Sequence, residues 1–452
     1  MDELDQGMKK DEWKSRLGFM LAAMGSAVGL GNIWRFSYVA GENGGATFLL
    51  IYIFFILAFG IPLLLAEFSV GKAGKKDAVG SFMRLAPGTK WHWTGVMGVI
   101  GGTLILSFYS VVSGWSLYYL FHYLIGDFWT EPTGGFGQGF EDWTSSTWGP
   151  LIWQFLFMVA VVFVVIRGIK RGIERANLIA MPALAILMVV LAVYSLTLDG
   201  ASEGLAFLFT PDWSQLSNPQ VYLAAMGQAF FSLSLGISGM LTYASYLKSK
   251  DRLPAATVGI GVMDTVFAII AGIVIFPAVF SFGVDVQSGP KLVFITLPSI
   301  FASIPAGGLV GIAFFVLLVM AAYSSALSML EIPVAYFHRT LGLSRRAASI
   351  LCGSVIFAIG ITVSLGHGVL SHVTIVGDKG ILDSIDYVTG NFILPLGAML
   401  IAIFVGWYWT RDQAIKNSEI NNHSLQSIWY FIVRYIAPVV VLVVALTSIF
   451  SK

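Results

Sequence analysis

The sequence predicts an all-α polytopic membrane protein that crosses the bilayer eleven times. Three observations predict this fold class: 57% of the 452 residues are hydrophobic, only 11% are charged, and long apolar stretches recur with short polar interruptions. So few charged residues cannot coat a water-soluble protein of this length. A helix of about 20 apolar residues spans a hydrocarbon core of roughly 30 Å, so the lipid bilayer is the expected solvent.

The expected spans follow the apolar stretches in chain order. Their approximate ranges are 17–39, 46–71, 93–124, 149–167, 176–198, 222–246, 256–283, 306–337, 346–366, 388–410 and 427–450. Each range is long enough to cross the bilayer as a helix, because every backbone polar group must be satisfied within lipid.

Basic and acidic connections alternate along the chain. Segments 125–148 and 199–220 contain acidic residues and no Lys or Arg. The N-terminal segment and the even-numbered connections contain Lys9, Lys10, Lys14, Arg16, Lys72, Lys75, Lys76, Arg84, Lys90, Lys170, Arg171, Arg175, Lys248, Lys250, Arg252, Arg339, Arg345, Arg346, Arg411 and Lys416. Because basic loops face the cytoplasm, we predict a cell-membrane protein with a cytoplasmic N-terminus and, after eleven spans, an extracellular C-terminus.

Several protein classes are disfavoured by missing motifs. The sequence has no GxxxxGK[ST], GxGxxG, HExxH or GxSxG motif, so neither a nucleotide nor hydrolytic chemistry is expected. Its net charge of +1 favours no nucleic-acid partner. The mixed-charge run 1–16 predicts no cleaved signal peptide. A single cysteine, Cys352, excludes an intrachain disulfide, and the spacing of His367 and His372 does not suit a metal site on one helix face.

Small and polar residues interrupt the first span at 25–32, which reads GSAVGLGN. Glycine in a helix costs about 1 kcal/mol relative to alanine, so backbone unwinding is one interpretation. Close helix packing through small residues is the other. The sixth span has a similar interruption at 231–239, which reads FSLSLGISG. This second interruption favours unwinding of both spans.

The two interruptions are five spans apart. Because five is odd, a repeat of five spans is inverted in the membrane; the predicted repeats are 17–198 and 222–410, with 427–450 as an additional span. Paired broken helices in inverted repeats are typical of sodium-coupled carriers. Half-helix N-termini attract a carboxylate and unwound carbonyls attract a cation, which suits an amino acid.

Short motifs recur at separated places along nearly the whole chain. They are Trp13 with Arg16-Leu17-Gly18, the run 27–32 followed by Trp34-Arg35-Phe36, Glu42-Asn43-Gly44-Gly45, Arg167-Gly168, Gly172-Ile173-Glu174, Thr242-Tyr243-Ala244-Ser245-Tyr246 and Ser324-Ser325. Together they resemble the neurotransmitter:sodium symporter family in its bacterial, leucine-transporter-like branch, and within it the multi-hydrophobic amino-acid transporter type. The resemblance implies the leucine-transporter-like fold and sodium-coupled import of hydrophobic L-amino acids by alternating access.

The resemblance implies two sodium ions. One would be bound by Ala27, Asn32, Ser232 and Asp264 with the substrate carboxylate, and the other by Gly25, Val28, Ala321, Ser324 and Ser325. These positions supply oxygen ligands, which a hard cation prefers. The alternative for each serine is a hydrogen bond back to its own helix.

Asp264 is a carboxylate within the seventh span, where an unpaired charge costs about 2.5–3.5 kcal/mol on insertion scales. In the family that the chain resembles, many members have an asparagine at this position and bind chloride nearby. We therefore predict that the carboxylate of Asp264 replaces chloride and that transport is chloride-independent. Glu67 in the second span is expected to bond the broken backbone of the first and sixth spans.

The resemblance also implies a substrate pocket with an apolar end. Its lining would be Ala27, Gly29, Leu30, Gly31, Ile105, Tyr109, Phe231, Ser232, Ser234, Ile237, Ser325 and Met329. In the resembled family, the members that transport amines have an aspartate at the position of Gly29, which binds an amine that lacks a carboxylate. Gly29 therefore favours a substrate that is a whole amino acid. Ile237 and the adaptable thioether of Met329 favour aliphatic and aromatic side chains.

The resemblance also implies two gates, and the sequence offers a candidate hinge. Arg35 and Asp386 would close the outer side as an ion pair with Gln228 and Phe231, and Lys10, Trp13, Ser245 and Tyr246 would close the inner side. The family's acidic partner falls near Arg339, which is basic here. Gly172 and Pro182 form the candidate hinge of the fifth span, since proline removes a backbone hydrogen bond. A static kink is the alternative.

Two other functions share the binding motifs. An amino-acid-gated channel or a nontransporting amino-acid sensor would also bind sodium and substrate, but paired inverted breaks favour a carrier. An intramembrane enzyme is the weaker alternative, because the sequence offers no paired catalytic residues. Accumulation against a gradient separates a carrier from these.

Overall fold

The computed structural model describes residues 12–248, 251–283 and 292–450. Within them the chain is helical, and no β-strand occurs beyond one isolated bridge between Val376 and Lys379. Nine helical segments of these ranges are long and apolar enough to cross a membrane, and the bent pair α1 and α2 supplies a tenth. Helices α11 and α12 together occupy the remaining expected span. The predicted all-α multi-pass fold is therefore confirmed.

The membrane-crossing elements often consist of several helical pieces. In chain order they are α1 (Arg16–Ala27), η1 (Gly31–Arg35) and α2 (Phe36–Glu42); α3 (Ala46–Phe55), η2 (Ile56–Gly60) and α4 (Ile61–Gly74); α6 (His92–Ile125); α8 (Trp148–Ile166); η3 (Ile169–Ile173) and α9 (Glu174–Ser195); α11 (Pro219–Ser232) and α12 (Gly239–Ser245); α13 (Leu253–Ser281); α15 (Gly307–Arg339); α16 (Arg345–Leu365); α17 (Ile381–Val388), η6 (Thr389–Ile393), α18 (Leu394–Ile403) and η7 (Phe404–Tyr408); α20 (His423–Phe431), η8 (Ile432–Ile436) and α21 (Ala437–Phe450). The short η segments named here are π-helical turns, which often mark functional sites.

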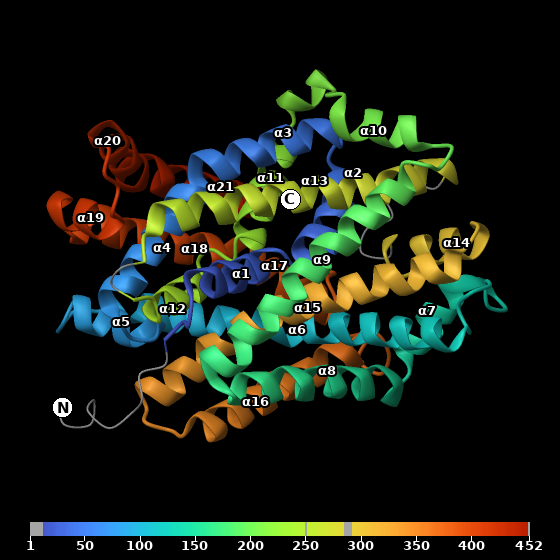
Figure 1. The fold of residues 1–452 in the computed structure, drawn as a ribbon, viewed down its shortest axis with the longest axis horizontal. Coiled ribbons are helices and arrows are strands. Elements are labelled where there is room, and N and C mark those ends of the chain that lie inside the picture. The colour runs from blue at the N-terminus through green and yellow to red at the C-terminus, as the bar shows by residue number, and fades with distance from the viewer. Residues whose placement is uncertain (1–11, 249–250, 284–291, 451–452) are drawn as a thin grey trace.

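The connections contain further short helices. These are α5 (Ala78–Leu85), α7 (Gly135–Ser145), α10 (Ala201–Phe209), η4 (Trp213–Ser217), α14 (Thr296–Ser303) and α19 (Arg411–Ser418). Figure 1 shows α5 and α19 at one end of the molecule and α7, α10 and α14 at the other. The acidic connections that contain α7 and α10 thus lie opposite the basic connections near α5 and α19.

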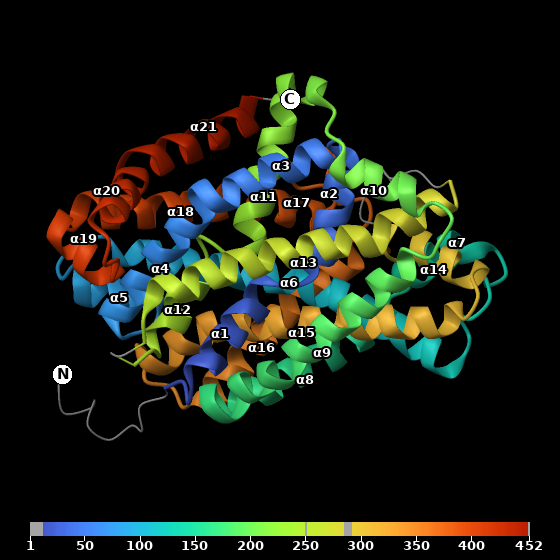
Figure 2. The same cartoon turned by 45° about the horizontal axis from the view of Figure 1, so that its top comes forward.

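The broken helices lie in the interior and run in opposite directions. Helix α1 contacts α12, whereas α2 and η1 contact α11, so the first half of one span lies beside the second half of the other. Helices α6 and α15 pack on each other, and α15 also packs on α1. Figure 2 shows α20 and α21 at the edge, where α21 packs on α18.

Side-chain caps fix where several helices begin. Ser15 Oγ accepts a hydrogen bond from Gly18 N at 2.9 Å and starts α1. Asp77 caps α5 by accepting from the amides of Val79 and Gly80, and Ser344 caps α16. Such caps satisfy helix amides that otherwise lack partners, typically for about 1 kcal/mol each.

Candidate functional site

The first span unwinds at residues 28–30. Helix α1 ends at Ala27, Val28 is extended, and the helical segments on the two sides differ in direction by 43°. The side chain of Ser325 on α15 donates to Gly25 O at 3.0 Å and to Ser26 O at 3.3 Å. Carbonyls near the break thus accept hydrogen bonds from a neighbouring helix. The unwinding interpretation is confirmed for this span.

The sixth span unwinds between α11 and α12. Ser234, Gly236 and Ser238 all have positive φ angles of 52°, 83° and 58°, which a helix cannot accommodate. Gly236 also needs the absence of a side chain, because a Cβ there would lie 2.0 Å from Leu394 O. Its amide donates to Glu67 Oε1 at 2.6 Å. Glu67 therefore bonds the break of the sixth span as predicted, while no bond to the first span is found among the described residues.

Asp264 on α13 lies at the meeting point of both broken spans. Its Oδ1 accepts from Asn32 Nδ2 at 2.8 Å, and its Oδ2 accepts from Ser232 Oγ at 2.9 Å and from Tyr52 Oη at 2.8 Å. Asn32 Nδ2 also lies 3.0 Å from Asp264 O, and Asn32 Oδ1 accepts from Gly29 N at 3.3 Å. The structure thus brings together three of the four residues predicted for the first sodium site, all buried.

The residues predicted for the second sodium site lie between α1 and α15. A Cβ at Gly25 would lie 3.0 Å from Ser324 Cβ, so the two helices are in close contact. Ser325 donates to Gly25 O as described above, and Ser324 Oγ donates to Ala321 O at 2.9 Å within its own helix. Ala321, Val28 and both serines are buried.

Asn177 on α9 borders this second group of residues. Its Oδ1 would lie 2.2 Å from a Cβ at Gly25, so it sits directly against the end of α1. Its Nδ2 donates to Ile173 O at 2.9 Å, whereas Oδ1 has no hydrogen-bond partner in the described part of the chain although the residue is fully buried. Buried polar atoms normally have a partner, often water or an ion.

The residues predicted for the substrate pocket converge beside these clusters. Leu30 N donates to Tyr109 Oη at 3.1 Å, and a Cβ at Gly29 would lie 2.1 Å from Ser325 Oγ and 2.9 Å from Tyr109 Oη. Any side chain at position 29 would displace one of these hydroxyls. Phe231 covers Gly31, since a Cβ there would lie 3.1 Å from its ring.

The apolar residues of the predicted pocket come from three elements. Ile105 lies on α6, Met329 on α15 and Ile237 in the break of the sixth span; all three are buried. Gly101 allows close approach of the sixth span, because a Cβ there would lie 3.1 Å from Ile237 Cγ2, and a Cβ at Gly102 would lie 2.9 Å from Ile332 Cδ1 on α15. Ser234 Oγ donates to Ser26 O at 3.1 Å and links the two breaks, beside the buried Ala27.

The outer closure differs from the predicted ion pair. Arg35 Nη1 donates to Gln228 Oε1 at 2.8 Å, Gln228 Nε2 donates to Gly31 O at 2.7 Å, and the guanidinium lies 4.9 Å from the Phe231 ring centroid. Within the described ranges Arg35 forms no direct ion pair with Asp386, and the outer gate formed by these two residues stays a prediction. Arg35 instead approaches the span of Asp386 one helical turn further along the chain, where its guanidinium lies 3.9 Å from the position of a Cβ at Gly390.

The residues predicted for the inner closure cluster around Trp13, Tyr243 and Tyr246. Trp13 Nε1 donates to Tyr243 O at 2.9 Å, and its ring lies edge-on to the Tyr243 ring. Tyr246 Oη donates to Glu331 Oε1 at 2.6 Å. Lys10 lies outside the described residues.

Arg339 joins this closure as a cation rather than as the family's acid. Its Nη1 donates to Ser245 Oγ at 2.8 Å, and its guanidinium lies 4.9 Å from the centroid of the Tyr246 ring. The acidic member is Glu331, which is fully buried and ion-pairs with Arg345. The acid of this cluster is therefore Glu331, which lies two turns before Arg339 on α15.

The candidate hinge lies where η3 meets α9. A Cβ at Gly172 would lie 2.2 Å from Val164 O, so only glycine fits there, and Pro182 lies inside α9. Glu174 ties the chain before α1 to this segment by accepting from Lys14 N at 2.7 Å and Ser15 Oγ at 2.9 Å. Asn177 lies midway between Gly172 and Pro182.

Three residues of this region were missed from the sequence. Glu331 is an acidic residue within the eighth span, so the reasoning applied to Asp264 would have identified it. Tyr52 and Asn177 have no comparable signal, because a tyrosine or an asparagine in a membrane helix often serves packing or local hydrogen bonding.

Comparisons with known proteins agree with this architecture. Residues 10–133 and 125–452 match the family model of the sodium:neurotransmitter symporter family. The chain is 39% identical to the uncharacterized sodium-dependent transporter YhdH of Bacillus subtilis (strain 168), over 98% of each chain. It is 28% identical to the sodium- and chloride-dependent GABA transporter ine of Drosophila melanogaster, over 72% of this chain and 39% of that one.

A solved structure is similar over nearly the whole length. The crystal structure of MhsT in complex with L-phenylalanine has a TM-score of 0.93 and 54% identity, covering 97% of this chain and 100% of MhsT. The protein belongs to the sodium:neurotransmitter symporter family. It is a multi-pass membrane transporter rather than an enzyme.

Proposed function

We propose that the protein imports hydrophobic L-amino acids by sodium-coupled symport through alternating access. The observation that carries this proposal is the convergence of two unwound helices on buried oxygen atoms and one carboxylate. The similarity to MhsT, whose structure contains L-phenylalanine, supports an aromatic or aliphatic substrate. Ile105, Ile237 and Met329 supply the apolar end, and a pocket of this kind discriminates by only about 1–3 kcal/mol per methylene.

The substrate carboxylate is placed at the first break. Because Tyr109 Oη accepts from Leu30 N, its own proton remains to be donated to a carboxylate. The amides at the start of η1 add partial positive charge. Gly29 leaves no room for an aspartate, which agrees with a substrate that brings its own carboxylate.

Two sodium ions are assigned to the two clusters. The first site comprises Ala27, Asn32, Ser232 and Asp264, and the second comprises Gly25, Val28, Ala321, Ser324 and Ser325. Asp264 supplies the fixed negative charge of the first site, and three donors hold it in place. We expect sodium to replace some of these hydrogen bonds and to draw the substrate carboxylate to the same place.

Transport is proposed to be chloride-independent. A carboxylate at Asp264 compensates a sodium ion without an added anion, because opposite charges in a low-dielectric site attract strongly. The Drosophila relative is named as chloride-dependent, so under this proposal the two proteins differ in their need for chloride.

The cell membrane is the proposed location, with the N-terminus in the cytoplasm. The positive-inside rule supports this orientation, since the basic connections gather at one end of the molecule. Trp13, Tyr246 and Arg339 then close the cytoplasmic side, while Arg35, Gln228 and Phe231 close the outer side. An amino-acid-gated channel or sensor stays as the alternative.

Uptake into proteoliposomes tests the proposal directly. We expect tryptophan, leucine and phenylalanine to accumulate above the external concentration under an inward sodium gradient, equally in chloride and in gluconate. Equilibration without accumulation would indicate a channel, and sodium-dependent binding without flux would indicate a sensor. Accumulation that needs chloride would overturn the role of Asp264 alone.

A further inference from the structure

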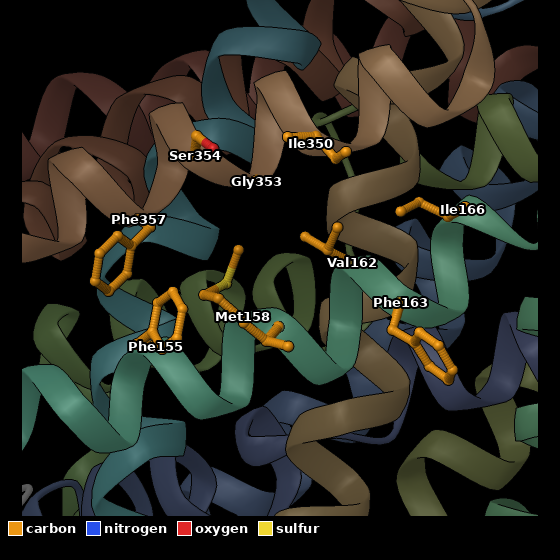
Figure 3. Close-up of a pocket in the computed structure, with 10 residues that line it drawn as sticks. Phe155, Met158, Val162, Phe163, Ile166, Ile350, Gly353, Ser354 and Phe357 are labelled. Atoms are coloured by element: carbon orange, nitrogen blue, oxygen red, sulfur yellow. The ribbon is translucent and has the colours of Figure 1, made fainter.

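An apolar groove separates α8 from α16 away from the transport site. Its volume is about 340 Å³, and it is lined by Phe155, Met158, Val159, Val162, Phe163, Ile166, Ile350, Gly353, Ser354 and Phe357. Figure 3 shows Phe155, Met158 and Val162 of α8 opposite Ile350 and Phe357 of α16. Ser354 supplies the only side-chain oxygen among these lining residues.

The groove opens to the hydrocarbon core of the bilayer. Phe155 and Phe163 are 51% and 56% exposed in the protein alone, and both lie in a span of high hydropathy. At Gly353 the helices touch, because a Cβ there would lie 2.4 Å from Val162 Cγ2. The groove therefore runs along the contact between two helices that meet at a glycine. Its lining of carbon atoms matches the chemistry of an acyl chain.

One end of the groove is positively charged. Arg167 follows the lining residue Ile166, and its guanidinium lies 4.0 Å from the centroid of the Phe163 ring. Arg345 Nε donates to Val165 O at 2.8 Å, which holds the start of α16 beside the end of α8. Arg346 is the next residue and precedes Ile350 by one turn, so it lies at the same end of the groove.

These two arginines are available to an anion, whereas Arg345 is not. Arg345 is paired with the buried Glu331. Arg167 and Arg346 are exposed, and neither forms an ion pair in the part of the chain that the structure describes. Basic residues at a helix pair on the cytoplasmic side commonly bind lipid headgroups.

We propose that this groove binds an anionic phospholipid, with one acyl chain between α8 and α16 and the phosphate at Arg167 and Arg346. A zwitterionic lipid offers the same chain but no net charge for the arginines. A second copy of the protein is disfavoured as occupant, because a two-fold contact at this groove would bring like-charged arginines together. The site is separate from the substrate pocket and does not depend on the proposed transport.

The proposed site also adjoins the candidate hinge. Position 172 packs against the same turn, since a Cβ at Gly172 would lie 2.2 Å from Val164 O and 3.3 Å from Arg167 Cβ. A phospholipid on Arg167 therefore contacts the connection that leads into α9.

Native mass spectrometry of the full chain in mild detergent tests whether a phospholipid binds with its acyl chain in the groove. The protein is titrated with dioleoyl phosphatidylglycerol or dioleoyl phosphatidylcholine, which share their chains and differ in charge. We expect at least fivefold more retained phosphatidylglycerol than phosphatidylcholine. Ser354→Phe fills the groove and should lower retention at least fivefold, whereas Val355→Phe, the next and equally lipid-facing position outside the lining, should not.

Charge is tested by the double variant Arg167→Gln with Arg346→Gln. It should abolish the preference for phosphatidylglycerol, while Arg175→Gln on α9 should keep it. Equal retention of both lipids by the unaltered protein, or an equal loss in Ser354→Phe and Val355→Phe, would overturn the proposal. A dimer that dissociates in Ser354→Phe without a change in bound lipid would assign the groove to a second copy instead. A single monodisperse peak in size-exclusion chromatography and an unchanged thermal unfolding midpoint verify that each variant is folded.

Discussion

The two clusters beside the broken helices hold their oxygen atoms in different ways. Around Asp264 both carboxylate oxygens accept hydrogen bonds from side chains of three other elements. Around Ser324 and Ser325 the oxygens are neutral carbonyls and hydroxyls. The adjoining wall contains Asn177 and a segment bounded by Gly172 and Pro182. The first cluster is therefore charged and fixed from several sides, and the second is neutral and bordered by a helix with weakened backbone bonding.

This difference suggests a division of roles. A charged, fully bonded cluster suits an ion that couples to the substrate carboxylate, because reorganising it costs several hydrogen bonds. A neutral cluster beside a helix that contains an internal proline suits an ion that leaves first toward the cytoplasm. Three variants test this division, in order of expected effect.

Asp264→Asn is expected to have the largest effect. It removes a charge that accepts three hydrogen bonds from side chains, and charge-assisted bonds contribute about 1.5–3 kcal/mol each. Sodium-driven uptake in gluconate should fall at least about 30-fold, since 1.4 kcal/mol corresponds to a factor of ten. Added chloride should restore part of it. Uptake in proteoliposomes at varied sodium measures this.

Two controls sharpen the first test. Asp378→Asn changes an exposed carboxylate in the connection before α17 and should leave uptake unchanged. Tyr52→Phe removes one donor to Asp264 but keeps the charge, so it should weaken sodium dependence about tenfold without creating a response to chloride. Full uptake by Asp264→Asn in gluconate would contradict a charged first site.

Asn177→Leu is expected to have an intermediate effect confined to the second cluster. The change keeps the approximate volume and removes the buried amide oxygen beside Gly25. If that oxygen coordinates sodium, or a water bound to sodium, during release to the cytoplasm, uptake should fall about fivefold to tenfold in the variant. This is the loss expected for one buried hydrogen bond of about 1 kcal/mol or more. Stopped-flow measurement of sodium release from preloaded protein gives the rate of the step that the variant should slow.

The matched control is Asn177→Gln, which keeps an amide at the same place. It should preserve more of the release rate than Asn177→Leu does. The affinity of the substrate at saturating sodium should be the same in both variants. A lower substrate affinity with unchanged sodium release would place Asn177 in packing rather than on the path of the ion.

Pro182→Ala is expected to have the smallest effect on transport. The change supplies an amide that can bond Leu178 O and so strengthens α9. We expect uptake to fall about twofold to fivefold while substrate binding is kept. Amide exchange of residues 172–182 in sodium-free buffer should be fast in the unaltered protein and slower in the variant. Uniform protection of this segment in both proteins would identify Pro182 as a static kink.

The sequence by itself determined the all-α multi-pass fold, the order of its apolar helices and the places where two spans unwind. Apolar length sets a span, and glycines with hydroxyls mark a weak helix, so both properties are local. Asn32, Ser232 and Asp264 were also found from the sequence, because polar residues in lipid are costly. The family resemblance supplied their grouping, and in the structure Asn32 and Ser232 each bond Asp264 at 3.0 Å or less.

Only the tertiary structure decided which faces of distant helices meet. Tyr52 is 212 residues from Asp264 and bonds it, Asn177 borders Gly25, and Glu331 accepts from Tyr246. The same holds for Arg35, which contacts Gln228 rather than Asp386, and for the groove between α8 and α16. In a bilayer every apolar face is compatible with lipid, so periodicity alone cannot select the partner of a helix; close packing and a few buried hydrogen bonds select it.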